Sequence, residues 1–378
     1  MRILNVIGTA QLGGAERVVL ELTQELRRRG LHVDILCSPS LAKHYRPTGA
    51  RIFPSTYGGI GHIAGVLSMA LIGSRYDIVH LHGLSASIIC SFVPLLKRTK
   101  YIVTLHGSEG QMLTSTARDL RTTINCICVR QAVRRATSII AVSTPLADTF
   151  SSSRNRVMVV YNGVNSSLVK SMAMKNRHLT VWLKQLKERG FSCLVFPGRL
   201  ESRSKGQDVM ILAMKKLIDA KVKVCATFTF GPGGERDLQK LQELVRSLGI
   251  RHRVFFRQLG PGEQYAYMAE ADVIVTHLVQ EHTSFEGISQ VHLEAGALGK
   301  PLVAINSRDM RIFRGLPFLL SSSDPSEVAA KVEYILEHRH EANNRAEGMA
   351  LIVENEFVWP HVASKYLQIY NDARNANS

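Results

Sequence analysis

The sequence has no hydrophobic run long enough to span a membrane. The uncharged apolar stretch of residues 84–96 contains Pro94 and is too short, because a membrane-spanning helix needs about 20 apolar residues. Residues 1–8, MRILNVIG, place only a few apolar residues before Gly8, so they predict a first strand and not a secretory signal. We therefore expect a cytoplasmic protein without a transmembrane helix.

Cysteine is scarce, and several metal and cofactor motifs are missing. The six cysteines include no CxxC pair, which argues against a zinc or redox site and indicates a reducing compartment. There is no Asp-x-Asp, so a divalent metal held by two carboxylates has no support. Because no G-x-G-x-x-G follows the first expected strand, a dehydrogenase is disfavoured.

Acidic residues are few relative to basic ones, and the formal net charge is +16. Lys and Arg outnumber Asp and Glu by 12 over residues 1–170 and by 4 over residues 171–378. A basic first half suits an anionic partner such as a membrane leaflet, a lipid pyrophosphate acceptor or nucleic acid, although a solvated basic face is the alternative. The basic clusters lack interleaved aromatics, so nucleic acid is disfavoured.

The length and the pattern of apolar runs predict two α/β domains. A chain of 378 residues with 45% hydrophobic and 21% charged residues can form two globular cores. Short β-branched runs alternate with helical stretches, which favours parallel, doubly wound sheets. A polar, helical segment interrupts this series after residue 165, so we place the boundary near 170. The expected strands are residues 3–7, 33–38, 76–82, 101–106, 139–143, 157–163, 193–197, 224–230 and 271–275.

Two glutamates mark the stretch that follows the expected strand 271–275. Glu286 and Glu294 are separated by seven residues, and Gly287 follows the first. If a helix begins near Gly287, the carboxylates lie roughly 12 Å apart along its axis. The unpaired N–H groups of its first turn could then bind phosphate between them. This spacing fits a sugar nucleotide, and two glutamates on a solvated helix face are the alternative.

Two cations follow the expected strand 193–197. Gly198 and Arg199 come directly after it, and Lys205 lies six residues further along a glycine-containing loop. Both cations could point at one pyrophosphate from the carboxyl end of the strand. Surface charge is the alternative. The G-P-G-G turn that begins at Gly231 follows the next strand in the same way.

Histidines and glycines stand at further strand ends in the first half. His82 and His106 end two expected strands, where doubly wound sheets bind ligands, and His80 and His82 are candidates of lower rank than His106. A histidine that only caps a strand is the alternative. Gly13 and Gly14 lie where a helix begins and would allow close approach of a ligand to the backbone.

Together these segments resemble a known family. The stretch from Glu286 to Glu294 resembles the E-x7-E region of retaining nucleotide-sugar glycosyltransferases of the GT-B fold, in particular glycosyltransferase family 4. The matching residues are Phe285, Glu286, Gly287, Leu293, Glu294, Ala295, Gly299, Lys300, Pro301, Leu302 and Val303. The resemblance implies two Rossmann-like domains facing across a cleft, residues 1–170 and 171–357, with a final helix at 358–378 that completes the first domain.

The same resemblance implies roles for single residues. It places Glu286 and His106 at the donor sugar and Glu294 at the ribose. It makes Arg199 and Lys205 the cations that neutralise the departing diphosphate. The full set of residues expected to bind the donor or its nucleotide, Glu294 included, is Gly13, Gly14, Gly198, Gly231, Gly287, Ile288, Ser289 and Glu294.

The implied activity is a retaining, metal-independent glycosyl transfer. A hexose or N-acetylhexosamine would pass from a UDP-sugar or GDP-sugar to a saccharide or lipid-linked acceptor in polysaccharide or glycolipid synthesis, without a cofactor. The basic first domain allows a peripheral position on the inner face of the membrane.

One segment departs from the family pattern. Where the family has a Gly-Gly pair followed by glutamate, residues 305–315 are INSRDMRIFRG, which puts the donor sugar in doubt. A catalytically silent binding subunit therefore stays open. A nucleotide-sugar epimerase of the same fold, which would need a donor but no acceptor, is the other alternative.

Overall fold

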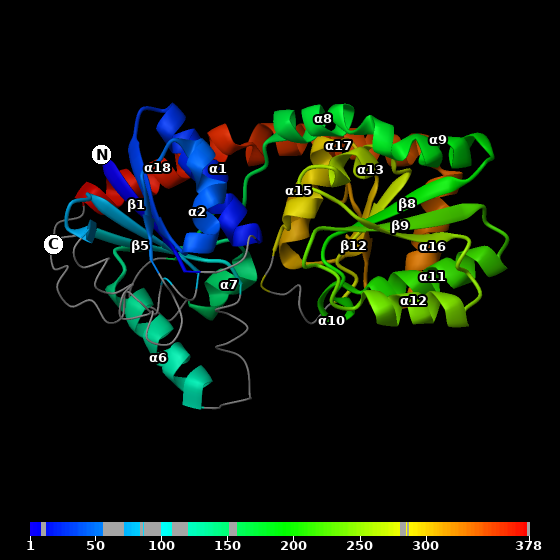
Figure 1. Cartoon of the computed structure of the whole chain (residues 1–378), viewed down its shortest axis with the longest axis horizontal. Coiled ribbons are helices and arrows are strands. Elements are labelled where there is room, and N and C mark those ends of the chain that lie inside the picture. Colours follow the sequence, from blue (N-terminus) through cyan, green and yellow to red (C-terminus); the bar gives the residue numbers. More distant parts are fainter. Residues whose placement is uncertain are drawn as a thin grey trace. The chain divides into compact units, whose positions relative to one another are not determined.

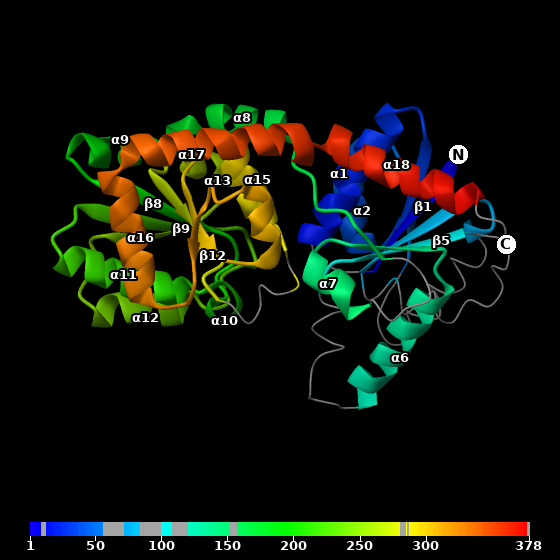
Figure 2. The ribbon, with the colours of Figure 1, turned by 180° about the vertical axis from the view of Figure 1, so that it is seen from behind.

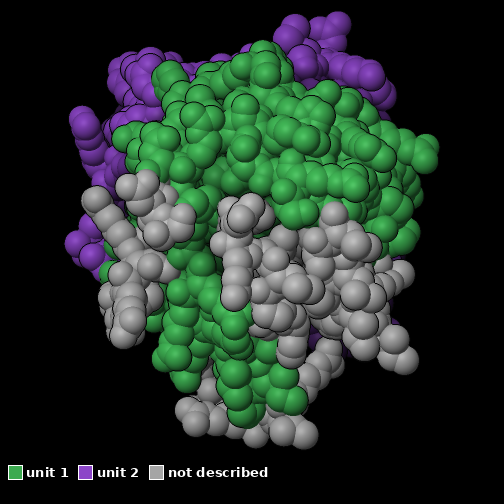
Figure 3. All heavy atoms as spheres, turned by 90° about the vertical axis from the view of Figure 1, so that its left-hand side faces the viewer, with its two compact units in different colours: residues 1–163, 285–287, 359–378 green, residues 164–284, 288–358 purple. Residues whose placement is uncertain are grey.

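The computed structural model describes residues 1–8, 13–55, 72–83, 86, 100–107, 120–150, 157–279, 285 and 287–375. The chain forms two compact units, coloured separately in Figure 3. Unit 1 comprises residues 1–163, 285–287 and 359–378, and unit 2 comprises residues 164–284 and 288–358. The division falls at Gly163 and not near residue 170, because Val164 pairs with Val358 and the Asn165 side chain caps the first helix of unit 2.

Unit 1 contains a sheet whose strands are all parallel, in the order β3-β2-β1-β4-β5-β6-β7. Its apolar runs are buried along nearly their whole length, as expected for a sheet covered on both faces. The strands are β1 (Arg2–Ile7), β2 (His32–Cys37), β3 (Ile52–Pro54), β4 (Ile78–His82), β5 (Lys100–Leu105), β6 (Ser138–Ala141) and β7 (Val157–Val159).

Helices cover both faces of this sheet. Those that lie within the described residues of this unit include α1 (Gly14–Arg28), α2 (Pro39–Tyr45), η1 (Arg46–Thr48), α6 (Leu120–Arg135), α7 (Thr144–Thr149) and α18 (Trp359–Asn375). Helices α1 and α18 lie side by side in Figures 1 and 2 and share one apolar cluster with the sheet, whereas α6 packs in the cluster of the opposite face. The final helix therefore belongs to unit 1.

Unit 2 contains a second parallel sheet, in the order β10-β9-β8-β11-β12-β13. Its strands are β8 (Ser192–Pro197), β9 (Val224–Phe230), β10 (Val254–Gln258), β11 (Val273–Val275), β12 (Leu302–Ile305) and β13 (Phe318–Leu320). Each expected strand of both units is found, with ends that agree or are shifted by up to four residues. The strand expected at residues 157–163 differs most from its predicted length, since its pairing with β6 covers Val157–Val159.

Two groups of helices cover the second sheet, one on each side in Figure 1. Helices α11, α12 and α16 bury their apolar residues against the sheet in one large cluster. The helices are α8 (Ser166–Lys175), η2 (Arg177–Thr180), α9 (Val181–Glu188), α10 (Ser202–Lys205), α11 (Gln207–Asp219), α12 (Leu238–Ser247), α13 (Gln264–Glu270), α15 (Gln290–Ala297), η3 (Arg308–Phe313), α16 (Pro325–Glu337), α17 (Arg339–Ile352) and η4 (Val353–Phe357). Within the described ranges, no helix is both long and apolar enough to cross a membrane.

Candidate functional site

The strand order of each sheet reverses at one point, and several of the predicted site residues follow the strands that flank it. Unit 1 reverses between β1 and β4, and unit 2 between β8 and β11. Ligands of doubly wound sheets bind outside the carboxyl ends of the strands at this point. In unit 1, β4 ends at His82; in unit 2, Gly198 and Arg199 follow β8, while Thr276 and His277 follow β11.

The loop after β8 is held against the turn after β9. The carbonyl of Arg199 accepts a hydrogen bond from Gln207 Nε2 at 2.7 Å, and Leu200 N donates to the Gly234 carbonyl at 2.8 Å. The Arg199 side chain is exposed. The structure therefore brings Arg199 beside the G-P-G-G turn of residues 231–234, and its guanidinium is accessible to a ligand.

Lys205 ends the short helix α10 and points at a histidine that the sequence analysis did not single out. Its Nζ lies 2.8 Å from His277 Nε2, and the other ring nitrogen, Nδ1, lies 2.8 Å from Thr276 Oγ1. His277 is 5% exposed and Thr276 is fully buried. Residues from two neighbouring loops of the switch point thus meet around the Lys205 ammonium.

Gly206 lets these two loops touch. Its φ is +79°, and a Cβ at this position would lie 2.8 Å from the Cβ of Leu278. Leu278 N also donates to the Lys205 carbonyl at 3.0 Å. The backbone that carries Lys205 is therefore fixed against the segment after β11, and only glycine fits there without displacing it.

The helix after β11 begins later than predicted. We expected it to start near Gly287, but α15 starts at Gln290 with Ser289 as its N-cap. Gly287 has a left-handed backbone with φ of +60°, which cannot begin a helix. Ser289 Oγ accepts from His292 N at 3.4 Å, and His292 Nδ1 accepts from Ser289 N at 3.2 Å. The first-turn amides thus belong to residues 290–293.

Glu294 is buried inside unit 2. Its side chain lies in the second turn of α15 and is 3% exposed. The Tyr265 hydroxyl of α13 donates to Glu294 Oε1 at 2.9 Å, which leaves the carboxylate with a defined orientation. Ile288, before the helix, is fully buried. The partner glutamate of the predicted pair, Glu286, lies outside the described residues, so the proposed spacing stays a prediction.

A row of histidines crosses the sheet of unit 1 at its switch point. His80 Nδ1 lies 2.7 Å from the Tyr370 hydroxyl, and His80 Nε2 lies 2.7 Å from Thr104 Oγ1. The His80 and His82 ring centroids are 3.9 Å apart, and His82 Nδ1 lies 3.4 Å from His106 Nε2. The half-buried His106 therefore stands at one end of a polar network that reaches back to α18.

Burial keeps these three rings neutral. It lowers the pKa of His80 to about 3, with the charge of His106 as a smaller cause, and lowers the pKa of His106 to about 4. Burial is also the main reason that the pKa of His82 lies well below its ordinary value, and the neighbouring histidines add to it. At neutral pH the rings can donate and accept hydrogen bonds but carry no charge.

Gly13 and Gly14 lie at the start of α1, as predicted. Gly13 is the N-cap and Gly14 the first helical residue, and Gly13 N donates to Glu16 Oε2 at 2.7 Å. The carboxylate of Glu16 thus occupies the N-terminal end of the helix, where the predicted contact with a ligand would be made. Residues 9–12 of this loop lie outside the described residues.

The predicted residues fall into two groups. Those in unit 2 are Gly198, Arg199, Lys205, Gly231, Ile288, Ser289 and Glu294, and those in unit 1 are Gly13, Gly14, His106 and Gly287. Within unit 2, the ring centroid of His277 lies 5.1 Å from that of His292, so Lys205 connects through His277 to the first turn of α15. His277, His292 and Tyr265 are the residues of this group that the sequence analysis missed.

The segment that departs from the family pattern forms η3. It follows β12, and Met310 and Phe313 are fully buried. Its apolar side chains therefore contribute to the core of unit 2. Among the described side chains, no group of three His, Cys, Asp or Glu residues is placed to hold a metal ion.

Two protein-family models match this chain. The model of Glycosyltransferase Family 4 matches residues 12–168, and the model of Glycosyl transferases group 1 matches residues 192–338. Each match covers most of one unit, and together they include every strand of both sheets except β1.

Curated relatives match over most of the chain. A D-inositol 3-phosphate glycosyltransferase of Corynebacterium diphtheriae is 26% identical, over 97% of this chain and 91% of that protein. Spore coat protein SA of Bacillus subtilis is 21% identical over 96% of each chain. A phosphatidyl-myo-inositol mannosyltransferase of Propionibacterium freudenreichii is 24% identical over 79% of this chain and 75% of that protein.

Solved structures share the fold. Anabaena HepE, crystallised with UDP and glucose, has a TM-score of 0.80 at 20% identity, covering 98% of this chain and all of that one. Sucrose-phosphate synthase of Thermosynechococcus elongatus has a TM-score of 0.77 at 16% identity, with full coverage of both. Two Rossmann-like units with these matches define a glycosyltransferase of the GT-B fold. The chain belongs to the family 4 type of these enzymes, which use a nucleotide-sugar donor.

Proposed function

We propose that this enzyme transfers a hexose or N-acetylhexosamine, with retention of anomeric configuration, from a UDP-sugar or GDP-sugar to an anionic or lipid-linked acceptor. The observation that carries the proposal is the placement of Arg199 and Lys205 at the switch point between β8 and β11. In such a reaction the bond between the anomeric carbon and the diphosphate breaks. The acceptor oxygen bonds to that carbon from the same face and gives its proton to the departing diphosphate.

In this proposal the protein itself stabilises the leaving group. Arg199 and Lys205 supply two positive side chains, and the first turn of α15 supplies backbone N–H groups and the positive end of a helix dipole. Preorganised donors of this kind usually supply the largest part of the rate enhancement. No divalent metal is needed for the diphosphate to leave, and activity in EDTA is the corresponding expectation.

Two observations favour an anionic acceptor, namely the names of the relatives and the positive charge of residues 1–170. Two of the relatives are named for inositol 3-phosphate and phosphatidyl-myo-inositol, which are both anionic. Residues 1–170 carry an excess of 12 basic over acidic residues, which would attract such an acceptor. We therefore favour an inositol phosphate or its lipid as acceptor over a neutral saccharide.

Helix α6 supports a membrane-proximal acceptor. It exposes Ile124 and Ile127, which are 46% and 57% exposed, and carries the exposed cations Arg130 and Arg134 one to three turns further along. Apolar side chains together with cations suit the surface of an anionic bilayer. Flotation with vesicles of phosphatidylglycerol, compared with phosphatidylcholine vesicles, tests this part separately.

A donor screen tests the proposal as a whole. The chain is incubated with UDP, GDP, ADP and their sugars, and melting temperature and product formation are measured with inositol phosphate, phosphatidylinositol and a neutral saccharide. A ligand that binds only the folded chain raises its melting temperature. One nucleotide should raise it, and its sugar should be transferred with retention to an anionic acceptor. Absence of transfer from every donor would overturn the proposal.

The same screen separates the two alternatives. Conversion of the donor to its isomer without acceptor would identify an epimerase. Binding of a nucleotide without transfer or hydrolysis would identify a silent binding subunit.

A further inference from the structure

We propose that His277 is the positioning residue for Lys205, a neutral imidazole that holds the lysine ammonium at the switch point. The inference rests on the proposed function in one respect, namely that Lys205 contacts the donor diphosphate. The contact itself, 2.8 Å between Lys205 Nζ and His277 Nε2, is a property of unit 2 alone.

The backbone of His277 is held in an unusual conformation. In the described part of the chain, only Lys221, His277 and Arg314 have a positive φ without being glycine. Lys221 and Arg314 are exposed and follow helix ends, where such turns are common, whereas His277 is buried. Ile305 N donates to the His277 carbonyl at 3.1 Å and ties this backbone to the end of β12. Strain that the surroundings maintain at a buried position suggests a role for the side chain.

The hydrogen bonds fix the protonation of the ring. A lysine ammonium has three donors and no acceptor, so His277 Nε2 must accept from Lys205. The proton of a neutral ring then lies on Nδ1, which donates to Thr276 Oγ1 at 2.8 Å. A protonated ring would present a donor and a second positive charge to Lys205, so this geometry requires the neutral Nδ1–H form.

His277 also joins the lysine to helix α15. Its ring packs edge-on against His292, with an interplanar angle of 61°, and His292 belongs to the capping box that starts the helix. The proposed function assigns Lys205 and the first turn of α15 to the diphosphate. The imidazole of His277 contacts both, so it fixes their positions relative to each other. Because long lysine side chains have many rotamers, this contact selects one of them in advance of ligand binding.

The test is a double-mutant cycle in the full-length enzyme. His277→Phe keeps a ring without an acceptor, and His277→Gln restores an acceptor oxygen. We expect the Phe variant to lose on the order of 100-fold in kcat, as for a misplaced catalytic group, with little change in donor KM, and the Gln variant to recover most of it. In a Lys205→Ala background the Phe substitution should have no further effect.

A second variant and a spectroscopic signature complete the test. His277→Asn is the second variant that removes the contact, in case the Phe variant does not fold. Asparagine adopts the left-handed backbone readily, and its shorter side chain does not reach Lys205. In the wild-type chain with 15N-labelled histidine, the resonances that disappear in His277→Gln should have the Nδ1–H pattern. An Nε2–H pattern, or full effects of both His277 variants in the Lys205→Ala background, would overturn the inference. If Lys205→Ala itself leaves turnover unchanged, the role of Lys205 in the proposed function fails, and the NMR signature still decides whether His277 contacts Lys205.

Discussion

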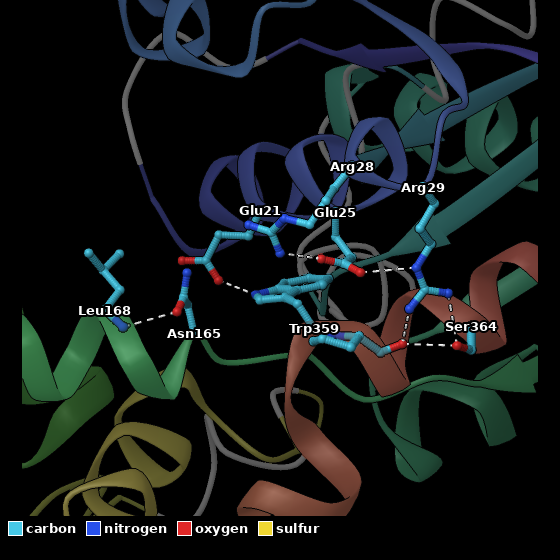
Figure 4. Close-up of polar contacts among 9 residues, drawn as sticks. Glu21, Glu25, Arg28, Arg29, Asn165, Leu168, Trp359 and Ser364 are labelled. Atoms are coloured by element: carbon cyan, nitrogen blue, oxygen red, sulfur yellow. Dashed lines mark hydrogen bonds and ion pairs between the residues drawn. The ribbon is translucent and has the colours of Figure 1, made fainter.

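The indole of Trp359 lies directly against Gly163. A Cβ on Gly163 would be 2.7 Å from Trp359 Cδ2 and 2.8 Å from Cε2, which is closer than real Cβ contacts. Trp359 starts α18, and its Nε1 donates to the buried carboxylate of Glu21 in α1 (Figure 4). Gly163, after which the chain enters unit 2, thus packs against Trp359, the first residue of α18.

Substitution of Gly163 should therefore destabilise the protein. We expect Gly163→Ala to lower the free energy of unfolding by about 1 to 3 kcal/mol, since the added methyl group must displace a buried indole. Urea unfolding followed by tryptophan fluorescence measures this. Gly14→Ala is the control, because a Cβ there meets nothing within 4 Å and alanine favours the helix. Equal destabilisation by both variants would contradict the packing argument.

Loss of either candidate diphosphate cation should slow the chemical step. Arg199→Ala or Lys205→Ala should each cost about 2 to 4 kcal/mol of transition-state stabilisation, comparable to the loss of an oxyanion donor. The measurement is kcat and kcat/KM for the best donor of the screen. Arg203→Ala is the matched control, since Arg203 is an exposed cation in the same short helix α10. Unchanged turnover in Arg199→Ala or Lys205→Ala would remove that residue from the proposed site.

The buried contact between Tyr265 and Glu294 should affect donor binding. If Glu294 binds the ribose, Tyr265→Phe should raise the donor KM, because a hydrogen bond to a charged group contributes about 1.5 to 3 kcal/mol. Tyr267→Phe is the matched control. Its hydroxyl lies in the same helix α13 and donates to the Leu179 carbonyl at 3.2 Å, away from Glu294. A KM that rises equally in both variants would indicate a general loss of packing.

Much of the fold follows from local sequence signals. Alternating apolar runs and helical stretches predicted both parallel sheets, because a strand buried on two faces needs a continuous apolar run. Two helix starts depend on local capping residues in the same way. Ser143 with Pro145 begins α7, and the Asp324 side chain accepts from Ser326 N at the start of α16. These signals depend on residues close in sequence, which is why they could be predicted.

The start of α15 and the contacts of the site depend on tertiary structure. Gly287 looks suited to a helix start in sequence, but its left-handed backbone delays the helix to Gln290. The pairing of Tyr265 with Glu294 has no local signal at all. His277 could have been predicted from the sequence. It follows a buried strand, and His82 and His106 were selected because they end expected strands. Its partner Lys205 lies 72 residues away in sequence.

The buried His80 should make stability depend on pH. Its pKa is lowered to about 3 in the folded chain, against about 6.5 in an unfolded one. Between these values the unfolded state binds a proton that the folded state excludes, so stability is complete above about pH 6.5 and is lost as pH falls. His80 alone should contribute up to about 1.4 kcal/mol per pH unit to this loss.

Substitution isolates this contribution. His80→Gln keeps polar atoms near Tyr370 and Thr104 but removes the titrating ring, so the free energy of unfolding should vary less steeply with pH. Urea unfolding at several values between pH 5 and 6.5 measures the slope in a window where most carboxylates stay ionised. His178→Gln, which replaces an exposed histidine, should leave the slope as in the wild type. If His80→Gln also leaves it unchanged, the ring is protonated within the folded core, and the neutral network that ends at His106 must be abandoned.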